Sequence, residues 1–289
     1  MRILLGGLAA LTLSAASTMA ADIPARMPVK APVMVAEVYN WTGFYIGGNG
    51  GYSWGRSRSD VNFFNSTTGV AIVPPAGSAT SNSFNLNGGV AGGQAGYNWQ
   101  TGIWVVGLET DLQWSGERGS ANFSCAPVAV VGGVCLPGAT FLPTSFTGTN
   151  VTVDQKIEWF GTFRARAGVL MAPSILAYVT GGLAYGSVKT DMGISSTLAT
   201  TLAGTPVSAS SSTSSLHAGW TIGGGVEAMF AGNWSAKLEY LYVDLGTFNS
   251  TVALAAPAIG ANFSSRVTDN IFRAGINYHF NAGPVVARY

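Results

Sequence analysis

The stretch Glu158–Leu170, EWFGTFRARAGVL, places two arginines in a segment that is otherwise mainly aromatic, apolar and glycine. Residues two apart on a β-strand share one face, so Arg164 and Arg166 lie together, and Glu158 and Thr162 share their face. The opposite face carries no charge and consists of Trp159, Phe163, Ala165, Ala167 and Val169. The stretch therefore predicts a strand with one charged and one apolar face.

The composition is unusual for a soluble protein. The chain has 289 residues, of which 47% are hydrophobic and only 9% are charged, and its mean hydropathy is positive. It is too apolar to be disordered and has too few charges for an ordinary water-exposed surface. The net charge of +1 provides no basic excess, so nucleic acid is not an expected partner.

The first residues predict export. Residues 1–20 contain one early cation, Arg2, then an apolar run and small residues before the expected cleavage after Ala20 or Ala21, which is typical of a secretory signal peptide. The alternative, a transmembrane anchor, needs about 20 strongly apolar residues. Residues 21–40, with prolines four apart, predict a Pro-rich periplasmic linker. A barrel domain over 41–280 and a tail over 281–289 complete the predicted organisation.

From residue 41 the apolar period is two, and eight segments read as strands: 41–55, 83–99, 103–115, 156–171, 175–189, 216–230, 234–245 and 268–280. These segments exceed the strand of about 5–6 residues that is typical of soluble proteins. Three short connections (100–102, 172–174, 231–233) alternate with four long ones rich in Ser, Thr, Gly and Pro (56–82, 116–155, 190–215, 246–267). This alternation predicts an all-β fold, an eight-stranded antiparallel up-and-down transmembrane β-barrel with short periplasmic turns and four long extracellular loops.

Charged residues fall on one face of each predicted strand. An Arg or Lys facing lipid at the bilayer midplane costs about 2–4 kcal/mol, so the charged face is expected to line the lumen. An eight-stranded barrel is just wide enough for side chains to fill it, and the near balance of charge favours ion pairs that plug the interior. The predicted lumen charge network comprises Glu109, Asp111, Glu158, Arg164, Arg166, Glu227, Lys237, Glu239 and Arg273.

Aromatic residues cluster near the ends of the predicted strands, where membrane interfaces favour Trp and Tyr. A soluble core would not produce such clustering. The predicted girdle residues are Trp41, Trp54, Trp99, Trp104, Trp114, Trp159, Trp220, Trp234, Tyr278 and Phe280.

Several motifs taken together, WTGFYIGGNGGYSWG, VGLETDLQWS, GTFRARAGVL, YVTGGLAYG, KLEYLYVDLG and FRAGINYHF, resemble the alphaproteobacterial outer-membrane surface-antigen family. Its members are immunogenic, porin-family β-barrels of eight strands, related to the OmpA, OmpX and opacity-protein type. The resemblance implies a Gram-negative outer-membrane protein in contact with lipid and lipopolysaccharide, and inserted by the barrel-assembly machinery through its C-terminal strand. Host or surface ligands would bind the loops. One departure is NAGPVVARY, which follows Phe280 where such barrels usually end on an aromatic residue.

The sequence is also compatible with two other functions. The first is a narrow porin-like channel for small solutes, with the lumen charges at its constriction. The second is a lipid A-modifying enzyme, because His217 lies beside Ser214 and Ser215, with Asp191 and Asp244 also near the outer rim. A serine-rich loop places a serine beside any histidine, so the sequence favours a monomeric, non-enzymatic protein.

No cofactor or metal is expected. Cys125 and Cys135 are the two cysteines; they lack nearby histidines and form a disulfide if the compartment is oxidising. The glycine strings GGVAGG and TIGGGVE lack the Lys-Ser/Thr ending of a phosphate loop. They are expected to relieve crowding where strands bend or where larger neighbours fill the lumen.

Overall fold

The computed structural model describes residues 39–73, 78–125, 146–198, 205–254 and 259–280, all within the compact unit Glu37–Tyr289. The predicted signal peptide, nearly all of the linker and the tail lie outside these residues. No helix among the described residues is long and apolar enough to cross a membrane.

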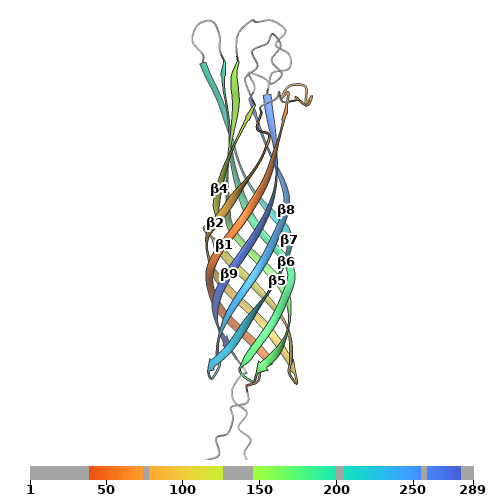
Figure 1. The fold of residues 1–289 in the computed structure, drawn as a ribbon, viewed down its shortest axis with the longest axis vertical. Coiled ribbons are helices and arrows are strands. Elements are labelled where there is room, and N and C mark those ends of the chain that lie inside the picture. Colours follow the sequence, from red (N-terminus) through yellow and green to blue (C-terminus); the bar gives the residue numbers. More distant parts are fainter. Residues whose placement is uncertain (1–38, 74–77, 126–145, 199–204, 255–258, 281–289) are drawn as a thin grey trace, which may run out of the picture. The chain divides into compact units, whose positions relative to one another are not determined.

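In the described part of the chain, nine strands form one closed antiparallel sheet, whose barrel shape is seen in Figure 1. β1 pairs with both β2 and β9, which closes the barrel. β3 and β4 both pair with β5 and follow one another along it, so together they occupy one position and the barrel has eight. The strands are β1 Gly43–Phe64, β2 Ser81–Thr101, β3 Trp104–Ser115, β4 Arg118–Cys125, β5 Phe146–Ala172, β6 Ile175–Leu198, β7 Thr205–Ala231, β8 Trp234–Leu254 and β9 Ile259–His279.

The short connections occur where the sequence predicts them, and Gly102 and Gly232 adopt the positive φ that tight turns require. The strands continue into all four segments predicted to be long loops, and within 190–215 and 246–267 they occupy most of the segment, so the loops are shorter than predicted there. The polar composition conceals a period of two: in β1, Val61 and Phe63 are buried while their polar neighbours face outward.

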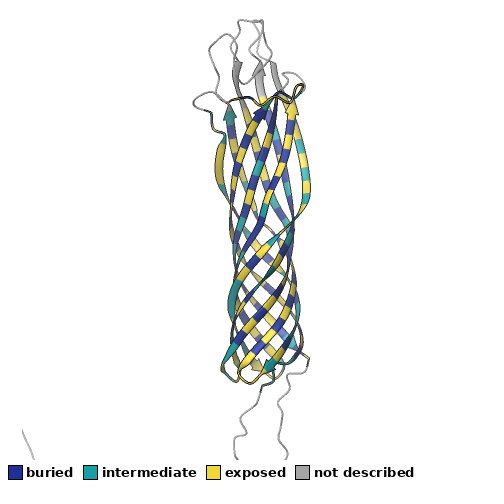
Figure 2. Ribbon diagram, turned by 90° about the vertical axis from the view of Figure 1, so that its right-hand side faces the viewer, coloured by how far each residue is buried: buried dark blue, intermediate teal, exposed yellow. Residues whose placement is uncertain are grey.

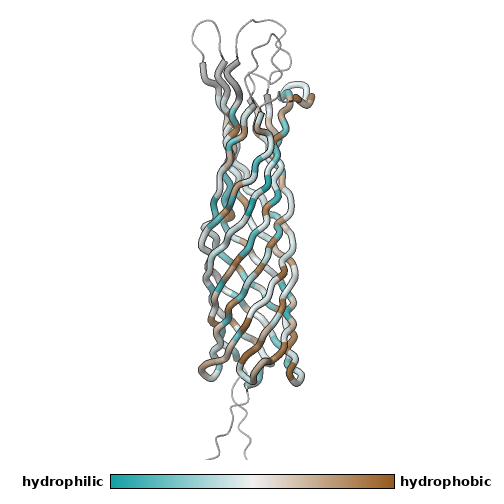
Figure 3. The backbone as a smooth tube through the Cα atoms, in the orientation of Figure 1, coloured by the Kyte–Doolittle hydropathy of each residue, from teal (hydrophilic) through white to brown (hydrophobic). Residues whose placement is uncertain are grey.

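The two faces of the long strands exchange character along their length, as β1 illustrates. Figure 2 shows buried and exposed residues alternating along the strands, and Figure 3 shows the matching alternation of hydropathy. Near the short turns the exposed side chains of β1 are Phe44, Ile46, Tyr52 and Trp54, whereas beyond Trp54 they are Arg56, Arg58, Asp60 and Asn62. An apolar exterior followed by a polar one fits a column that stands partly in lipid and partly in water.

The interior changes in the opposite sense. Beyond the charged part of the lumen, apolar side chains from both halves of the sheet fill the barrel and are almost fully buried. We call this group the distal core; it includes Val61, Phe63, Leu86, Phe123, Val151, Val153, Ile157, Phe160, Val188, Met192, Ile194, Phe248, Val252, Phe263 and Val267. Because it has the burial of a soluble protein core, the extended strands are stabilised without lipid.

Around the distal core the barrel wall divides into two sheets. The β7–β8 ladder ends at Trp220↔Asp244, although both strands continue further, and β2 shares only the pair Asn87↔Arg118 with β4. Figure 1 shows β4–β7 parting from β8, β9, β1 and β2 away from the short turns. A bulge in β8 containing Gly246, with φ of 77°, lies where its pairing with β7 ends, as expected of bulges that redirect a strand.

The exchange of faces predicts opposite outcomes for neighbouring residues of β9. Phe263 is buried in the distal core, whereas Asn262 is exposed. We expect Phe263→Asp to lower the free energy of unfolding by more than about 3 kcal/mol, because it removes a buried ring and buries a charge. Asn262→Asp should change it by less than about 0.5 kcal/mol. Urea unfolding of the refolded protein checks this, and equal effects would mean that the faces of β9 are misassigned.

Candidate functional site

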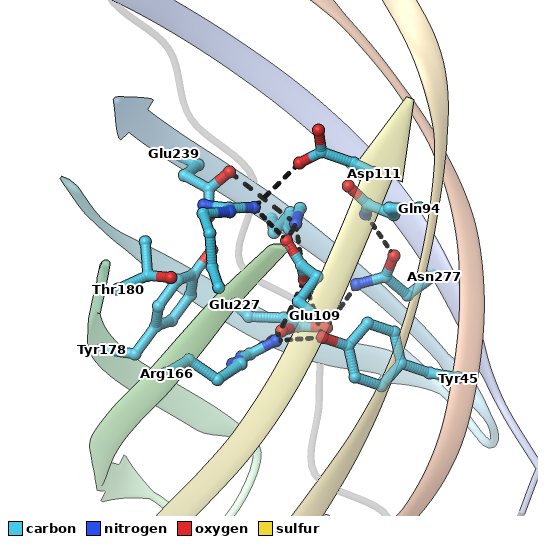
Figure 4. Close-up of polar contacts among 12 residues, drawn as sticks. Tyr45, Gln94, Glu109, Asp111, Arg166, Tyr178, Thr180, Glu227, Glu239 and Asn277 are labelled. Carbon is cyan, nitrogen blue, oxygen red and sulfur yellow. Dashed lines mark hydrogen bonds and ion pairs between the residues drawn. The ribbon is translucent and has the colours of Figure 1, made fainter. Parts of the chain in front are cut away.

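Among the described residues, eight charged side chains meet inside the barrel, between the short turns and the distal core. Figure 4 labels Glu109, Asp111, Arg166, Glu227 and Glu239 among them. The eight come from β3, β5, β7, β8 and β9, and none is more than 3% exposed. Carboxylates and cations are equal in number. This lumen network consists of Glu109, Asp111, Glu227, Glu239, Arg164, Arg166, Lys237 and Arg273.

Glu109 is the most heavily coordinated of these carboxylates. The Nζ atom of Lys237 lies 2.9 and 3.0 Å from its two oxygens, and Arg164 donates to Oε1. On the other side the hydroxyl of Tyr45 donates to Oε2 at 2.7 Å, and Arg166 lies 3.5 Å from the same oxygen. Charge-assisted hydrogen bonds of this kind are stronger than neutral ones, so Glu109 connects the two halves of the network.

The first half joins Arg164 and Arg273 through two shared carboxylates. Arg164 donates to Glu239 and to Asp111, each at 3.0 Å. Arg273 donates through Nε to Glu239 and through Nη2 to Asp111, both at 2.7 Å. Each arginine therefore connects strands that are not neighbours in the sheet, which ties opposite walls of the barrel together.

The second half is centred on Arg166 and Glu227, whose charged atoms lie 2.7 Å apart. The guanidinium stacks 4.2 Å from the ring centroid of Tyr178, at cation–π distance. Glu227 also accepts hydrogen bonds from Ser235 at 2.6 Å and from Asn277 at 2.7 Å. These neutral donors satisfy the carboxylate lone pairs that Arg166 does not reach.

Glycines make room for the two tyrosines of the network. A Cβ atom on Gly96 would lie 2.4 Å from the ring of Tyr45, and one on Gly225 would lie 2.8 Å from the hydroxyl of Tyr178. Gly225 belongs to the string TIGGGVE, so the prediction that such glycines relieve crowding in the lumen is confirmed there.

Trp41 corrects the predicted aromatic girdle. It is fully buried; its backbone N–H donates to the Gln100 side chain at 2.8 Å, and its indole N–H donates to the Pro173 carbonyl at 3.2 Å. Trp41 and inward-facing Tyr45 are both odd-numbered, and this shared parity could have indicated that Trp41 also faces inward. Trp41 covers the short-turn end of the lumen in a second apolar group, the proximal core, with Val105, Leu176, Tyr178 and Met229.

The other predicted girdle residues lie on the outer surface. Trp159 and Tyr278 are half-buried against the aromatic neighbours Tyr185 and Trp234. The exposed ones are Trp54, Trp99, Trp104, Trp114, Trp220, Trp234 and Phe280.

Glu158 does not belong to the lumen network, contrary to the prediction from its even numbering. A bulge in β5 between Ile157 and Trp159 shifts the register against β6, so residues before and after it face inward with opposite parity. Glu158 consequently lies outside, 4.0 Å from Lys156, with 39% of its side chain exposed. Because Glu158 lies outside the lumen, the lumen network contains equal numbers of carboxylates and cations.

Sequence reasoning missed the uncharged members of the network, Tyr45, Tyr178, Ser235 and Asn277. All four share the numbering parity of inward-facing charges on their own strands or on the paired strand, and this signal could have identified them. It also missed Glu117, which falls in a segment predicted to be a loop.

Glu117 and Asp269 form a separate buried acidic pair, beyond the outer aromatic residues of their strands. Ser115 donates to Glu117 at 3.0 Å, and Ser53 donates to Asp269. Burial, and secondly the neighbouring Asp269 carboxylate, raises the pKa of Glu117 to about 9. Burial also raises the pKa of Asp269. At neutral pH the pair therefore retains a proton on Glu117.

The residues considered for catalysis are not assembled. Ser214 hydrogen-bonds to Ser187 at 3.1 Å, and Asp244 pairs with Arg266. Among the described residues the Nε2 atom of His217 has no hydrogen-bond partner.

The described residues also contain no group of three or more His, Cys, Asp or Glu that could hold a metal ion. The Cys125–Cys135 disulfide falls outside the described residues, because Cys135 is not among them.

The acidic pair predicts a pH-dependent stability. A carboxyl whose pKa is raised from 4.5 to about 9 binds more protons in the folded than in the unfolded protein between these values. The contribution of Glu117 to stability should therefore be greatest below pH 4.5 and fall as the pH rises toward 9. We expect Glu117→Gln to flatten this dependence in urea unfolding series from pH 4 to 9. An equally steep loss of stability in the variant would exclude Glu117 as its source.

The lumen network predicts strong coupling between Glu109 and Lys237. Glu109→Gln leaves an excess of buried cations and should cost about 3–5 kcal/mol of unfolding free energy. Adding Lys237→Met restores the charge balance, so the double variant should be more stable than the sum of the single effects by about 1 kcal/mol or more. Urea unfolding of all four proteins measures this difference; additive losses would contradict the coupling.

The comparisons with known proteins agree with this architecture. The model of the outer membrane protein beta-barrel domain matches residues 7–280. A 31 kDa outer-membrane immunogenic protein of Brucella melitensis biotype 1 is 34% identical over 271 residues, covering 92% of this chain and 95% of the relative. A 22 kDa outer membrane protein of Rhizobium leguminosarum bv. viciae is 28% identical over 290 residues, covering 97% of this chain and all of the relative.

Similar solved structures include Ail, the attachment invasion locus protein of Yersinia pestis, with a TM-score of 0.29, 13% identity, and coverage of 80% of this chain and 99% of that one. The outer membrane protease OmpT of Escherichia coli has a TM-score of 0.37 and 9% identity, covering 84% and 98%. These likenesses are too distant to support a functional argument. The family match and the close relatives establish that this chain belongs to the outer membrane protein β-barrel domain family and resides in the Gram-negative outer membrane.

Proposed function

We propose that this protein is a closed, non-enzymatic barrel with a structural and surface-antigen role in the outer membrane. The observation that carries the proposal is the layering of the lumen. The charged network lies between the proximal core and the distal core, and both cores consist of almost fully buried apolar side chains. Ions could pass through the barrel only if water entered both apolar cores.

The energetics of the network also favour closure. Each buried charge has a partner of opposite sign at hydrogen-bond distance. Hydrating the lumen would separate Arg164 from Glu239 and Arg166 from Glu227 while it disrupted the apolar layers. A narrow channel for small solutes remains the alternative, because charged side chains also line selective pores.

The polar extension beyond the outer girdle supports a surface role. The long strands hold hydrophilic side chains clear of the apolar band, and residues such as Arg58, Asp60 and Asn62 are exposed. Relatives of this chain carry the name outer-membrane immunogenic protein. We propose that the extension and its connecting loops are the antigenic surface and bind host or surface ligands.

The remaining partners follow from the closed barrel. A closed barrel has no free strand edge within the membrane, so we propose a monomer surrounded by outer-membrane lipid and lipopolysaccharide. We also propose that β9 is the strand read by the barrel-assembly machinery, because it ends with the outward aromatics Tyr278 and Phe280 beside the β1–β9 closure.

Planar-bilayer recording tests the closed barrel. Refolded protein should show no stepwise current at voltages of either sign, whereas a porin refolded in the same way serves as the positive control. The variant Arg164→Ala/Arg273→Ala should remain silent as well, because the distal core lies between the network and the exterior. Reproducible channel steps from the wild-type protein would favour the porin-like alternative.

A further inference from the structure

The lysines and arginines of the described residues occupy two places only. Four belong to the lumen network, and the others all project outward just beyond the outer aromatic residues. Arg56 follows Trp54 by two residues, and Lys156 precedes Trp159 by three. In the described part of the chain no Lys or Arg projects outward at the short-turn end. We call the outward group the cation belt: Arg56, Arg58, Arg118, Lys156, Lys189 and Arg266.

Strand register places like charges directly opposite one another in the belt. Arg118 of β4 is paired with Lys156 of β5, and Lys156 is paired in turn with Lys189 of β6. On the other side of β2, Arg58 is paired with Arg266 of β9. Like charges directly opposite on neighbouring strands destabilise a sheet. The paired cations of the belt therefore repel one another, and an anion bound from outside would reduce this repulsion.

The protein itself compensates this charge only in part. Lys156 lies 4.0 Å from Glu158, and Lys189 lies 3.7 Å from Asp191, both in half-exposed pairs. Such surface pairs contribute little. Among the described residues no carboxylate lies within 4.0 Å of Arg56, Arg58 or Arg118. Three arginines at the membrane boundary thus remain available to an anionic group.

We propose that the cation belt binds the phosphate groups of lipid A in the outer leaflet, with the row Arg118–Lys156–Lys189 as its centre. Arginine forks match phosphate oxygens and lysine supplies a point charge. The belt stands where headgroups begin, because the exposed aromatic residues directly below it mark the interface. This inference deepens the proposed function by naming a lipid partner, and it rests on the outer-membrane placement of the barrel, not on a closed lumen.

The depth of the belt favours a lipid over a soluble polyanion. On β1, β5 and β6 the next outward side chain beyond the belt is acidic: Asp60 follows Arg58, Asp154 lies beyond Lys156, and Asp191 follows Lys189. Asp154 and Asp191 are themselves paired across β5 and β6. A long polyanion lying along the extension would meet this acidic row. A thin layer of headgroup phosphates would meet only the cations.

The test compares the wild-type protein with Arg118→Gln/Lys156→Gln/Lys189→Gln in detergent micelles containing lipid A. Bound lipid per protein is counted by native mass spectrometry across a lipid titration. Each cation near an anionic membrane surface contributes about fivefold to binding, so the triple variant should bind roughly a hundredfold more weakly. The matched control Asp154→Asn/Asp191→Asn alters the next row and should bind as tightly as wild type or more tightly.

Further binding measurements on the wild-type protein identify the ligand. Wild-type protein should prefer bisphosphorylated lipid A to the same lipid after enzymatic dephosphorylation, and the preference should weaken as salt increases. Competition by inorganic phosphate at millimolar concentration, or by heparin in the absence of lipid, should be weak. Equal binding of phosphorylated and dephosphorylated lipid A would overturn the proposal. Tighter binding of heparin than of lipid A would assign the belt to a soluble polyanion.

Folding of every variant is checked by heat-modifiable gel mobility, so that loss of binding is read only from folded barrels. If the triple variant does not fold, Lys189→Gln alone should still reduce binding about fivefold, and unchanged binding would count against the proposal. Bilayer conductance is recorded on the same samples. Because lipid selectivity and current are separate measurements, a conducting protein that still selects phosphorylated lipid A would overturn the closed barrel but not the belt.

Discussion

The rest of this structure depends on the neutralisation of charge inside a barrel too narrow to hold water around it. Eight strands leave room for side chains and little else, so a charge that avoids lipid by facing inward must find a partner there. Glu109 accepts from Arg164, Lys237 and Tyr45. The contacts of Glu109 with Lys237 and Tyr45 cross the lumen from strands that do not pair with β3, whereas Arg164 lies directly opposite Glu109 on the neighbouring strand β5. The network therefore fixes the strand register and the radius of the barrel together. A buried pair of this kind adds little net stability, yet losing one partner is costly.

The strands of this chain are also in contact with two different solvents, lipid along one part of their length and water along the other. In lipid the strands face outward with apolar side chains and inward with charges, and in water they do the reverse. A period of two supports both arrangements without any change of backbone. The exchange in β1 occurs within a few residues, between Trp54 and Val61. Around the distal core the wall divides into two sheets, and bulges near Gly246 and Glu158 lie where the division begins.

The sequence predicted the membrane half of the fold well and the outer half poorly. Aromatic ends, tight turns and alternating charge located the strands from Trp104 to Trp114 and from Trp234 to Tyr242, because lipid allows no polar exception on the outer face. Beyond the girdle, serine and threonine fit either a loop or a water-exposed strand, so composition could not distinguish the two. The apolar residues at alternate positions, such as Val151 and Val153, were the available signal.

Sequence alone determined which side chains face inward wherever a strand is regular, since two residues per repeat leaves no choice once lipid covers one face. It therefore placed Arg164 and Arg166 in the lumen. The neighbouring strand β3 also brings Glu109 and Asp111 to these arginines, as adjacency in the sheet predicts. Only the tertiary structure decided the distant partners, Glu239 for Arg164 and Glu227 for Arg166, because those contacts join β5 to β8 and β7 across the interior. It also decided that Trp41 covers the end of the lumen, through contacts with the distant residues Gln100 and Pro173. It decided the exception at Glu158 as well, because a one-residue change of register at a bulge reverses a strand's faces and no local pattern records it.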